Sequence, residues 1–212
     1  MKHAQQRQTV VDLCRELSRR GYFAATGGNL ALRIDAGHFA VTPSALDYHA
    51  MEASDVCVLR LSDLAQVEGD RPASVETGLH ARVLRARPDA GCSIHTHQPI
   101  ASACALLNRA PEVPQELQAS LGPRVPVVGY APSGSNWLAA RLAKALRPDI
   151  NAYFMRNHGV LCCGRDTGSA MQAVEDIEAL ARSYLQRRIA AHAASQPSLR
   201  AVLGRVSAAL AA

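Results

Sequence analysis

Two histidines separated by one residue, His95 and His97, are the side chains of this chain best suited to chemistry. They follow the apolar run 91–94, which is typical of a β-strand. Successive side chains of a strand point to opposite faces, so both imidazoles should leave the strand on the same side and be able to bind one metal ion. Such a pair also occurs in proteins without metal, so it indicates a metal site only if other segments of the chain supply further ligands.

Two further segments supply a carboxylate and a third imidazole: Glu76 lies in the stretch 74–76, and His158 lies in the stretch 157–159. Three neutral imidazoles form a common set of Zn²⁺ ligands and leave a position for water or substrate. A carboxylate beside such an ion can move a proton at carbon while the ion stabilises the negative charge that develops. We therefore expect a metal-dependent catalytic site in which Glu76 is the base. The alternative is three ordinary hydrogen-bonded histidines and a first-turn glutamate favoured by the helix dipole.

His80 lies four residues after Glu76, on the same face of an expected helix. It is a possible partner of the site, but we expect it to pack or to face solvent.

Several small polar residues have the composition of a phosphate-binding site. Closely spaced glycines let backbone N–H groups approach an anion, and hydroxyl or amide side chains add donors, particularly near the start of a helix. Taken singly, each of these segments is more often an ordinary turn. The expected phosphate contacts are Thr26, Gly28, Asn29, Thr42, Ser44 and Ser74.

The composition excludes several other classes of protein. The formal net charge is +5, but the basic residues are spread along the chain and aromatic residues make up only 4%, so we expect no nucleic-acid partner. An anionic small substrate fits the charge equally well. The six cysteines form no C-x-x-C pair, and no apolar run approaches the roughly 20 residues of a membrane span. We expect reduced thiols, a cytoplasmic protein and no membrane contact.

The periodicity of apolar residues indicates the elements that must hold these side chains. Strands and helices interleave without a strict βαβ rhythm, which favours a single α/β domain with a mixed or antiparallel central sheet flanked by helices. We place this domain at residues 1–191 and an alanine-rich helical tail at 192–212. Expected helices cover 4–20, a segment from Ser74 (as N-cap) to Arg87, 99–106, 135–146 and 167–191, and expected strands cover 30–34, 39–41, 56–61, 91–96, 125–128, 152–156 and 160–163.

In four ordered segments the chain resembles the class II aldolase/adducin-like superfamily: TGGN at 26–29, S-x-E at 74–76, HTH at 95–97 and NHG at 157–159. The resemblance covers roughly residues 7–184. It implies that His95, His97 and His158 bind one divalent ion per subunit, with zinc expected and manganese, cobalt or iron as alternatives. It also implies that Glu76 is the base, that the polar residues above contact a substrate phosphate, and that the chain forms a cyclic homotetramer with active sites between neighbours.

The resemblance leaves the reaction open. Residues 114–118 read PQELQ and resemble the methylthioribulose-1-phosphate dehydratase branch, in which a glutamate at the position of Glu116 is an acid/base. Residues 129–134 read GYAPSG and resemble the fuculose-1-phosphate aldolase branch. Fuculose aldolases, however, use a tyrosine in the segment that contains Glu116 and another in the C-terminal tail, where no tyrosine follows Tyr184 here. Val75 also stands where aldolases have a phosphate-contacting serine.

We favour retro-aldol cleavage of a ketose 1-phosphate to dihydroxyacetone phosphate and an aldehyde, with elimination of water as the alternative. A deoxy- or methylthio-pentulose 1-phosphate would suit the mixed features. A third interpretation is a non-catalytic interaction module, as in adducin heads, but such a module has no need for three histidines and Glu76.

Overall fold

The computed structural model describes residues 2–23 and 27–211. Its centre is an eight-stranded sheet with the order β4-β3-β2-β1-β5-β8-β7-β6. Every neighbouring pair is antiparallel except β6 and β7, which are parallel. The strands are β1 (Asn29–Arg33), β2 (His38–Val41), β3 (Cys57–Arg60), β4 (Gln66–Glu68), β5 (Cys92–Thr96), β6 (Val127–Val128), β7 (Ala152–Met155) and β8 (Gly159–Gly164).

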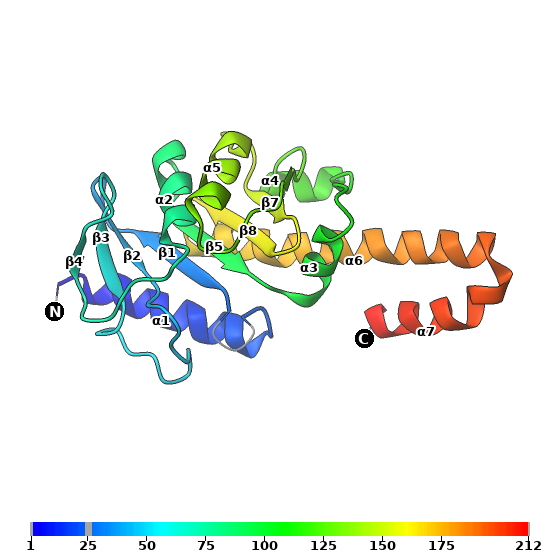
Figure 1. Ribbon diagram of the computed structural model, residues 1–212, viewed down its shortest axis with the longest axis horizontal. Coiled ribbons are helices and arrows are strands. Elements are labelled where there is room, and N and C mark those ends of the chain that lie inside the picture. Colours follow the sequence, from blue (N-terminus) through cyan, green and yellow to red (C-terminus); the bar gives the residue numbers. More distant parts are fainter. Residues whose placement is uncertain (1, 24–26, 212) are drawn as a thin grey trace.

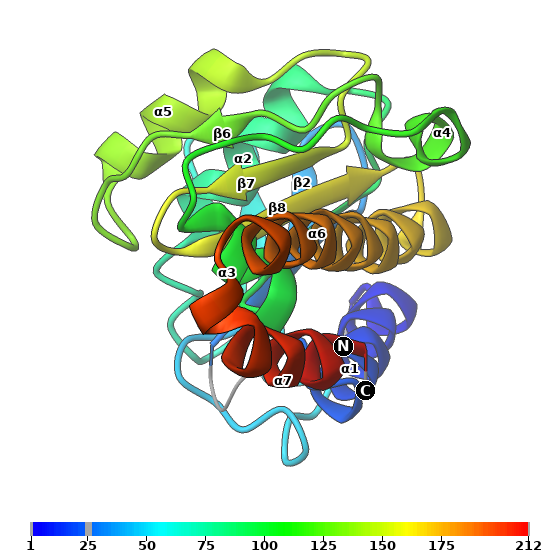
Figure 2. The same cartoon turned by 90° about the vertical axis from the view of Figure 1, so that its right-hand side faces the viewer.

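Helices cover both faces of this sheet (Figure 2). Helices α2 and α5 lie over one face, and α1, α3 and α6 lie over the other. The α-helices are α1 (Ala4–Arg19), α2 (Thr77–Ala86), α3 (Pro99–Ala105), α4 (Gln118–Leu121), α5 (Asn136–Ala145), α6 (Thr167–Ser195) and α7 (Arg200–Ala211). Two short 3₁₀ helices complete the chain, η1 (Gln115–Leu117) and η2 (Pro197–Leu199). The predicted α/β class with a mixed sheet flanked by helices is confirmed.

The alternation of side chains along the central strands divides the core into two layers. On β7, Phe154 packs with the helices α1, α3 and α6, whereas Tyr153 packs with α2 and α5. On β5, Cys92 and Ile94 belong to the first layer. Ser93 and His95 therefore point toward the layer covered by α2. This alternation places the polar residues of β5 beneath the helix that follows Glu76.

Most expected elements are present, with differences at their ends. Helix α2 begins at Thr77 with Glu76 as its N-cap, so the prediction that Ser74 is the N-cap is wrong. The carbonyl of Ser74 instead accepts hydrogen bonds from the backbone N–H and the hydroxyl of Thr77, which makes a tight turn before the helix. Strand β4 was not predicted, because its three residues are largely exposed and show no apolar alternation.

The C-terminal part of the chain forms an antiparallel pair of helices that projects from the body (Figure 1). Helix α6 continues to Ser195, past the expected end at residue 191, and α7 folds back alongside it. The Arg182 guanidinium donates a hydrogen bond to the carbonyl of Leu210. None of the helices within the described residues has the length and apolar character needed to cross a membrane.

Candidate active site

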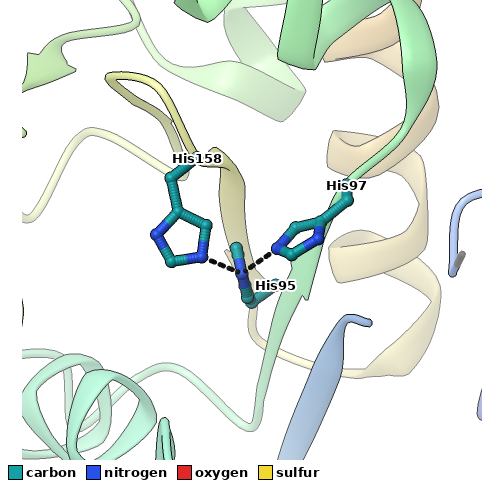
Figure 3. Close-up of side chains that lie close together, drawn as sticks. All are labelled: His95, His97 and His158. Atoms are coloured by element: carbon teal, nitrogen blue, oxygen red, sulfur yellow. Dashed lines mark hydrogen bonds between the residues drawn. The ribbon is translucent and has the colours of Figure 1, made fainter. Parts of the chain in front are cut away.

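His95, His97 and His158 converge on one point at the end of β5 (Figure 3). The Nε2 atom of His95 lies 2.9 Å from Nε2 of His97 and 3.1 Å from Nε2 of His158. The ring planes meet at 66° to 87°, so the nitrogens rather than the ring faces approach one another. His95 is fully buried, the side chain of His158 is only 7% exposed, and His97 is half-buried. The expected convergence of the three side chains is therefore present.

The turn between β7 and β8 brings His158 against β5. Asn157 has a φ of 54°, in the left-handed region that tight turns use and that asparagine tolerates. A Cβ atom on Gly159 would lie 2.3 Å from the carbonyl oxygen of Thr96. Only glycine permits this close approach of β8 to β5, which is why the segment NHG positions the imidazole.

The tautomer of His95 follows from its second nitrogen. Its Nδ1 lies 2.7 Å from the carbonyl oxygen of Val160, and a carbonyl can only accept a hydrogen bond. Nδ1 therefore carries the proton, and in the neutral ring Nε2 presents a lone pair to the centre of the cluster. Burial favours this neutral form, since it lowers the pKa of His95 to about 3. Burial likewise lowers the pKa of His97.

The carboxylate of Glu76 lies against two of the three imidazoles. Its Oε2 lies 3.2 Å from Nε2 of His95, and its Oε1 lies 3.2 Å from Nε2 of His158. Oε2 also accepts a hydrogen bond from Asn29 Nδ2 at 2.9 Å, and Oε1 accepts one from the Ser133 hydroxyl at 2.8 Å. Burial by itself raises the pKa of Glu76, but the neighbouring histidines and the Asn29 amide outweigh this and hold the pKa well below its ordinary value. The carboxyl is thus ionised.

The donor set fits a divalent cation. A lone pair of His95 and an ionised oxygen of Glu76 face each other at 3.2 Å with no hydrogen between them. Two acceptors at this separation repel unless a positive charge lies between or beside them. Nitrogens bound tetrahedrally to zinc at their usual bond length lie about 3.3 Å apart, close to the separations found here. The three imidazoles and Glu76 could therefore hold such an ion.

The segments expected to bind phosphate lie next to Glu76. The Thr42 hydroxyl accepts from the backbone N–H of Leu30 at 3.4 Å, and the Ser74 N–H donates to the carbonyl of Thr42 at 3.0 Å. The N–H of Ser44 donates to the carbonyl of Pro72, so residues 42–44 pair with residues 72–74. Thr26 lies outside the described residues.

Gly28 is required by packing in this cluster. Its φ is 94°, and an added Cβ would lie 2.3 Å from the ring of Phe23. Because glycine has no Cβ, the backbone at residue 28 can lie directly against the Phe23 ring, which no other residue would allow.

Two glutamates predicted to act together lie in different surroundings. Glu116 is exposed on η1, and no hydrogen bond or ion pair within the described residues joins it to Glu76 or to the three histidines. Sequence reasoning also missed Ser133, whose contact with Glu76 spans 57 residues. The segment GYAPSG was recognised, but nothing in its local pattern indicated which residue reaches the site.

The chain matches known proteins over most of its length. The profile of the family described as "Class II Aldolase and Adducin N-terminal domain" matches residues 8–185. A methylthioribulose-1-phosphate dehydratase of Serratia proteamaculans is 31% identical over 202 residues, which is 89% of this chain and 98% of the relative. A 5-deoxy-D-ribulose 1-phosphate aldolase of Bacillus thuringiensis is 30% identical over 184 residues, or 86% of this chain and 85% of the relative.

A solved structure of an L-fuculose 1-phosphate aldolase has the same architecture. Its TM-score is 0.81 at 27% sequence identity, with 89% of this chain and 88% of that chain covered. The relatives thus include both aldolases and a dehydratase, in agreement with the mixed features of residues 114–118 and 129–134.

Proposed function

Because this chain belongs to the class II aldolase and adducin N-terminal domain family, we propose that it cleaves a ketose 1-phosphate by a metal-dependent retro-aldol reaction. The products are dihydroxyacetone phosphate and an aldehyde. The observation that carries this proposal is the ionised Glu76, buried against three imidazoles whose Nε2 atoms converge. The class of substrate is supported by the 5-deoxy-D-ribulose 1-phosphate aldolase and L-fuculose 1-phosphate aldolase among the similar proteins.

We assign His95, His97 and His158 as ligands of one divalent ion, with zinc favoured by the all-nitrogen set and manganese, cobalt or iron as alternatives. When bound, this ion supplies Lewis-acid stabilisation of negative charge on the substrate. The contacts of Glu76 with His95 and His158, at 3.2 Å each, support a role for its carboxylate in the same reaction.

Glu76 is assigned the proton exchange at C3 of the sugar. In cleavage, the proton of the C4 hydroxyl leaves, the bond between C3 and C4 breaks to release the aldehyde, and C3 gains a proton. A buried carboxylate that two hydrogen bonds orient can remove this C3 proton in the synthetic direction and return it during cleavage. Thr26, Gly28, Asn29, Thr42, Ser44 and Ser74 are proposed to surround the substrate phosphate.

A second proton carrier is needed at the C4 oxygen, and Glu116 is the proposed group. Within the described residues, no hydrogen bond or ion pair joins it to Glu76 or the three histidines, so its exposure on η1 suits a contribution to a neighbouring subunit. This agrees with the proposed homotetramer, in which active sites lie between subunits. We also propose a cytoplasmic location, because all six cysteines are free thiols in buried positions.

Elimination of water is the second candidate reaction. It is favoured by the glutamate of residues 114–118 and by similarity to a dehydratase over 98% of that protein's length. Both reactions include a proton transfer at C3, next to the ketone. It is the first step of elimination and the last step of cleavage, so Glu76 would serve either one.

The products separate the two reactions. Metal-loaded protein is incubated with a panel of ketose 1-phosphates, including 5-deoxy and 5-methylthio pentuloses, and dihydroxyacetone phosphate is followed through glycerol-3-phosphate dehydrogenase as loss of NADH. We expect NADH loss with at least one substrate. Consumption of substrate with a diketone product and no NADH loss would establish dehydration instead. A chain that retains no metal and consumes none of the sugars would be an interaction module.

A further inference from the structure

Three buried polar side chains extend from Glu76 away from the histidine cluster. Asn29 on β1, His80 on α2 and Ser93 on β5 are 6%, 0% and 0% exposed. Ser93 Oγ lies 2.9 Å from His80 Nδ1, His80 Nε2 lies 2.7 Å from Asn29 Oδ1, and Asn29 Nδ2 lies 2.9 Å from Glu76 Oε2. They form a continuous chain of hydrogen bonds that ends on the carboxylate.

Only one arrangement of hydrogens satisfies every link. A carboxylate only accepts, so the NH₂ group of Asn29 must face Glu76 and its carbonyl oxygen must face His80. That oxygen also only accepts, so Nε2 of His80 carries the proton. In the neutral ring Nδ1 then accepts from the Ser93 hydroxyl. With the opposite tautomer of His80, two acceptors would face each other at 2.7 Å in the buried interior.

We propose that Ser93, His80 and Asn29 form a positioning relay that holds the carboxylate of Glu76 in the orientation needed for proton transfer. This inference rests on the proposed function of Glu76 as the base. Ser93 donates to Nδ1 of His80, the Nε2–H of His80 prevents the Asn29 amide from flipping, and Asn29 fixes Oε2. The expectation that His80 only packs or faces solvent does not account for two short hydrogen bonds on a fully buried ring.

Ser93 and His80 act by orienting Asn29 and Glu76 and not through contact with substrate. Its residues come from three elements, and pairing of Asn29 with His95 across β1 and β5 joins the relay to the same backbone that carries the histidine cluster. Loss of the His80 donor would let the Asn29 amide rotate and present its oxygen to Glu76, which would displace the carboxylate. Partners that orient a reactive or metal-binding group in this way typically account for 10- to 100-fold in activity or affinity, as a rough range.

The tautomer of His80 tests the relay without any turnover. We would record long-range ¹⁵N–¹H NMR spectra of the full-length chain, with and without added Zn²⁺, and identify His80 by the signal missing in His80→Gln. The expected result is a neutral ring protonated at Nε2 with Nδ1 as an acceptor. A ring protonated at Nδ1, or at both nitrogens, would overturn the relay.

Kinetics test the effect of the relay on Glu76. We expect His80→Leu to lower kcat by about 10- to 100-fold with KM nearly unchanged, and His80→Gln, which keeps a donor near Nε2, to recover most of it. Ser93→Ala should lower kcat by roughly three- to tenfold. Ser102→Ala is the matched control, since the buried hydroxyl oxygen of Ser102 has no hydrogen-bond partner within the described residues.

Wild-type kcat in both His80→Leu and Ser93→Ala would refute the relay. If His80→Leu does not fold, the tautomer and the Ser93→Ala result decide. If His80 is protonated at Nε2 but the protein turns over no ketose phosphate, the hydrogen-bond arrangement of the relay stands and the proposed function is refuted.

Discussion

Replacing Glu76 with glutamine should remove the base while leaving the site in place. The glutamine carbonyl can accept from Asn29, as Oε2 does at 2.9 Å. Its NH₂ group then faces the Ser133 hydroxyl, which can accept a hydrogen bond. The geometry therefore accommodates the amide in one orientation, and what is lost is the ionised oxygen that receives a proton.

The expected loss in kcat follows from that difference. General acid–base catalysis contributes roughly 10²- to 10⁴-fold, so Glu76→Gln should raise the barrier by about 3 to 5 kcal/mol. Weaker hydrogen bonds to a neutral amide should cost only about 1 kcal/mol of folding free energy, which shifts Tm by about 4 °C or less in a chain of this size. Metal content should fall far less than turnover.

The assay couples release of dihydroxyacetone phosphate to oxidation of NADH, with metal content and Tm measured on the same preparation. Glu52→Gln is the matched control, because Glu52 is an exposed glutamate outside the site. A Glu76→Gln enzyme that keeps kcat within about threefold of the wild type would show that Glu76 only occupies the N-cap position of α2 and accepts hydrogen bonds.

Three further outcomes are expected. His97→Ala should abolish metal retention, measured by elemental analysis, without changing the circular dichroism spectrum. The control His49→Ala, at an exposed position, should retain the metal. Equal metal content in the two variants would exclude His97 as a ligand. Glu116→Gln should keep the wild-type Tm, because Glu116 is exposed, but lower kcat by roughly 10² or more, and full activity would place this residue outside the site. Burial lowers the pKa of His80 to about 4, so the unfolded chain, with a histidine pKa near 6.5, binds more protons than the folded chain between these values. The free energy of unfolding should therefore fall as pH decreases through this range, with His80 accounting for about 2 kcal/mol of the decrease by pH 5. Denaturant titrations measure this free energy at each pH. The same dependence on pH in the wild type and in His80→Gln would contradict the prediction.

Local patterns were sufficient for most of the elements and for the histidines. The two-residue period of a strand predicts that His95, in β5, and His97, one residue past its end, leave on the same side. The segment NHG predicts a turn. Both predictions depend only on neighbouring residues in the chain. The start of α2 was misplaced at Ser74 because a serine that makes a turn two residues before the N-cap has the same local signature as an N-cap.

The partners of Glu76 required the folded chain. Asn29 is 47 residues from Glu76 in the sequence, and Ser133 is 57 residues from it. The periodicity of apolar residues does not predict which side chains meet across such separations. The role of His80 depends on the same assembly: its position on α2 was evident from spacing, but its two hydrogen bonds exist only because β1 and β5 pair beneath that helix. Helix and strand periods follow from local backbone geometry, whereas the direction of a buried hydrogen bond follows from which donors and acceptors the tertiary structure brings within about 3 Å.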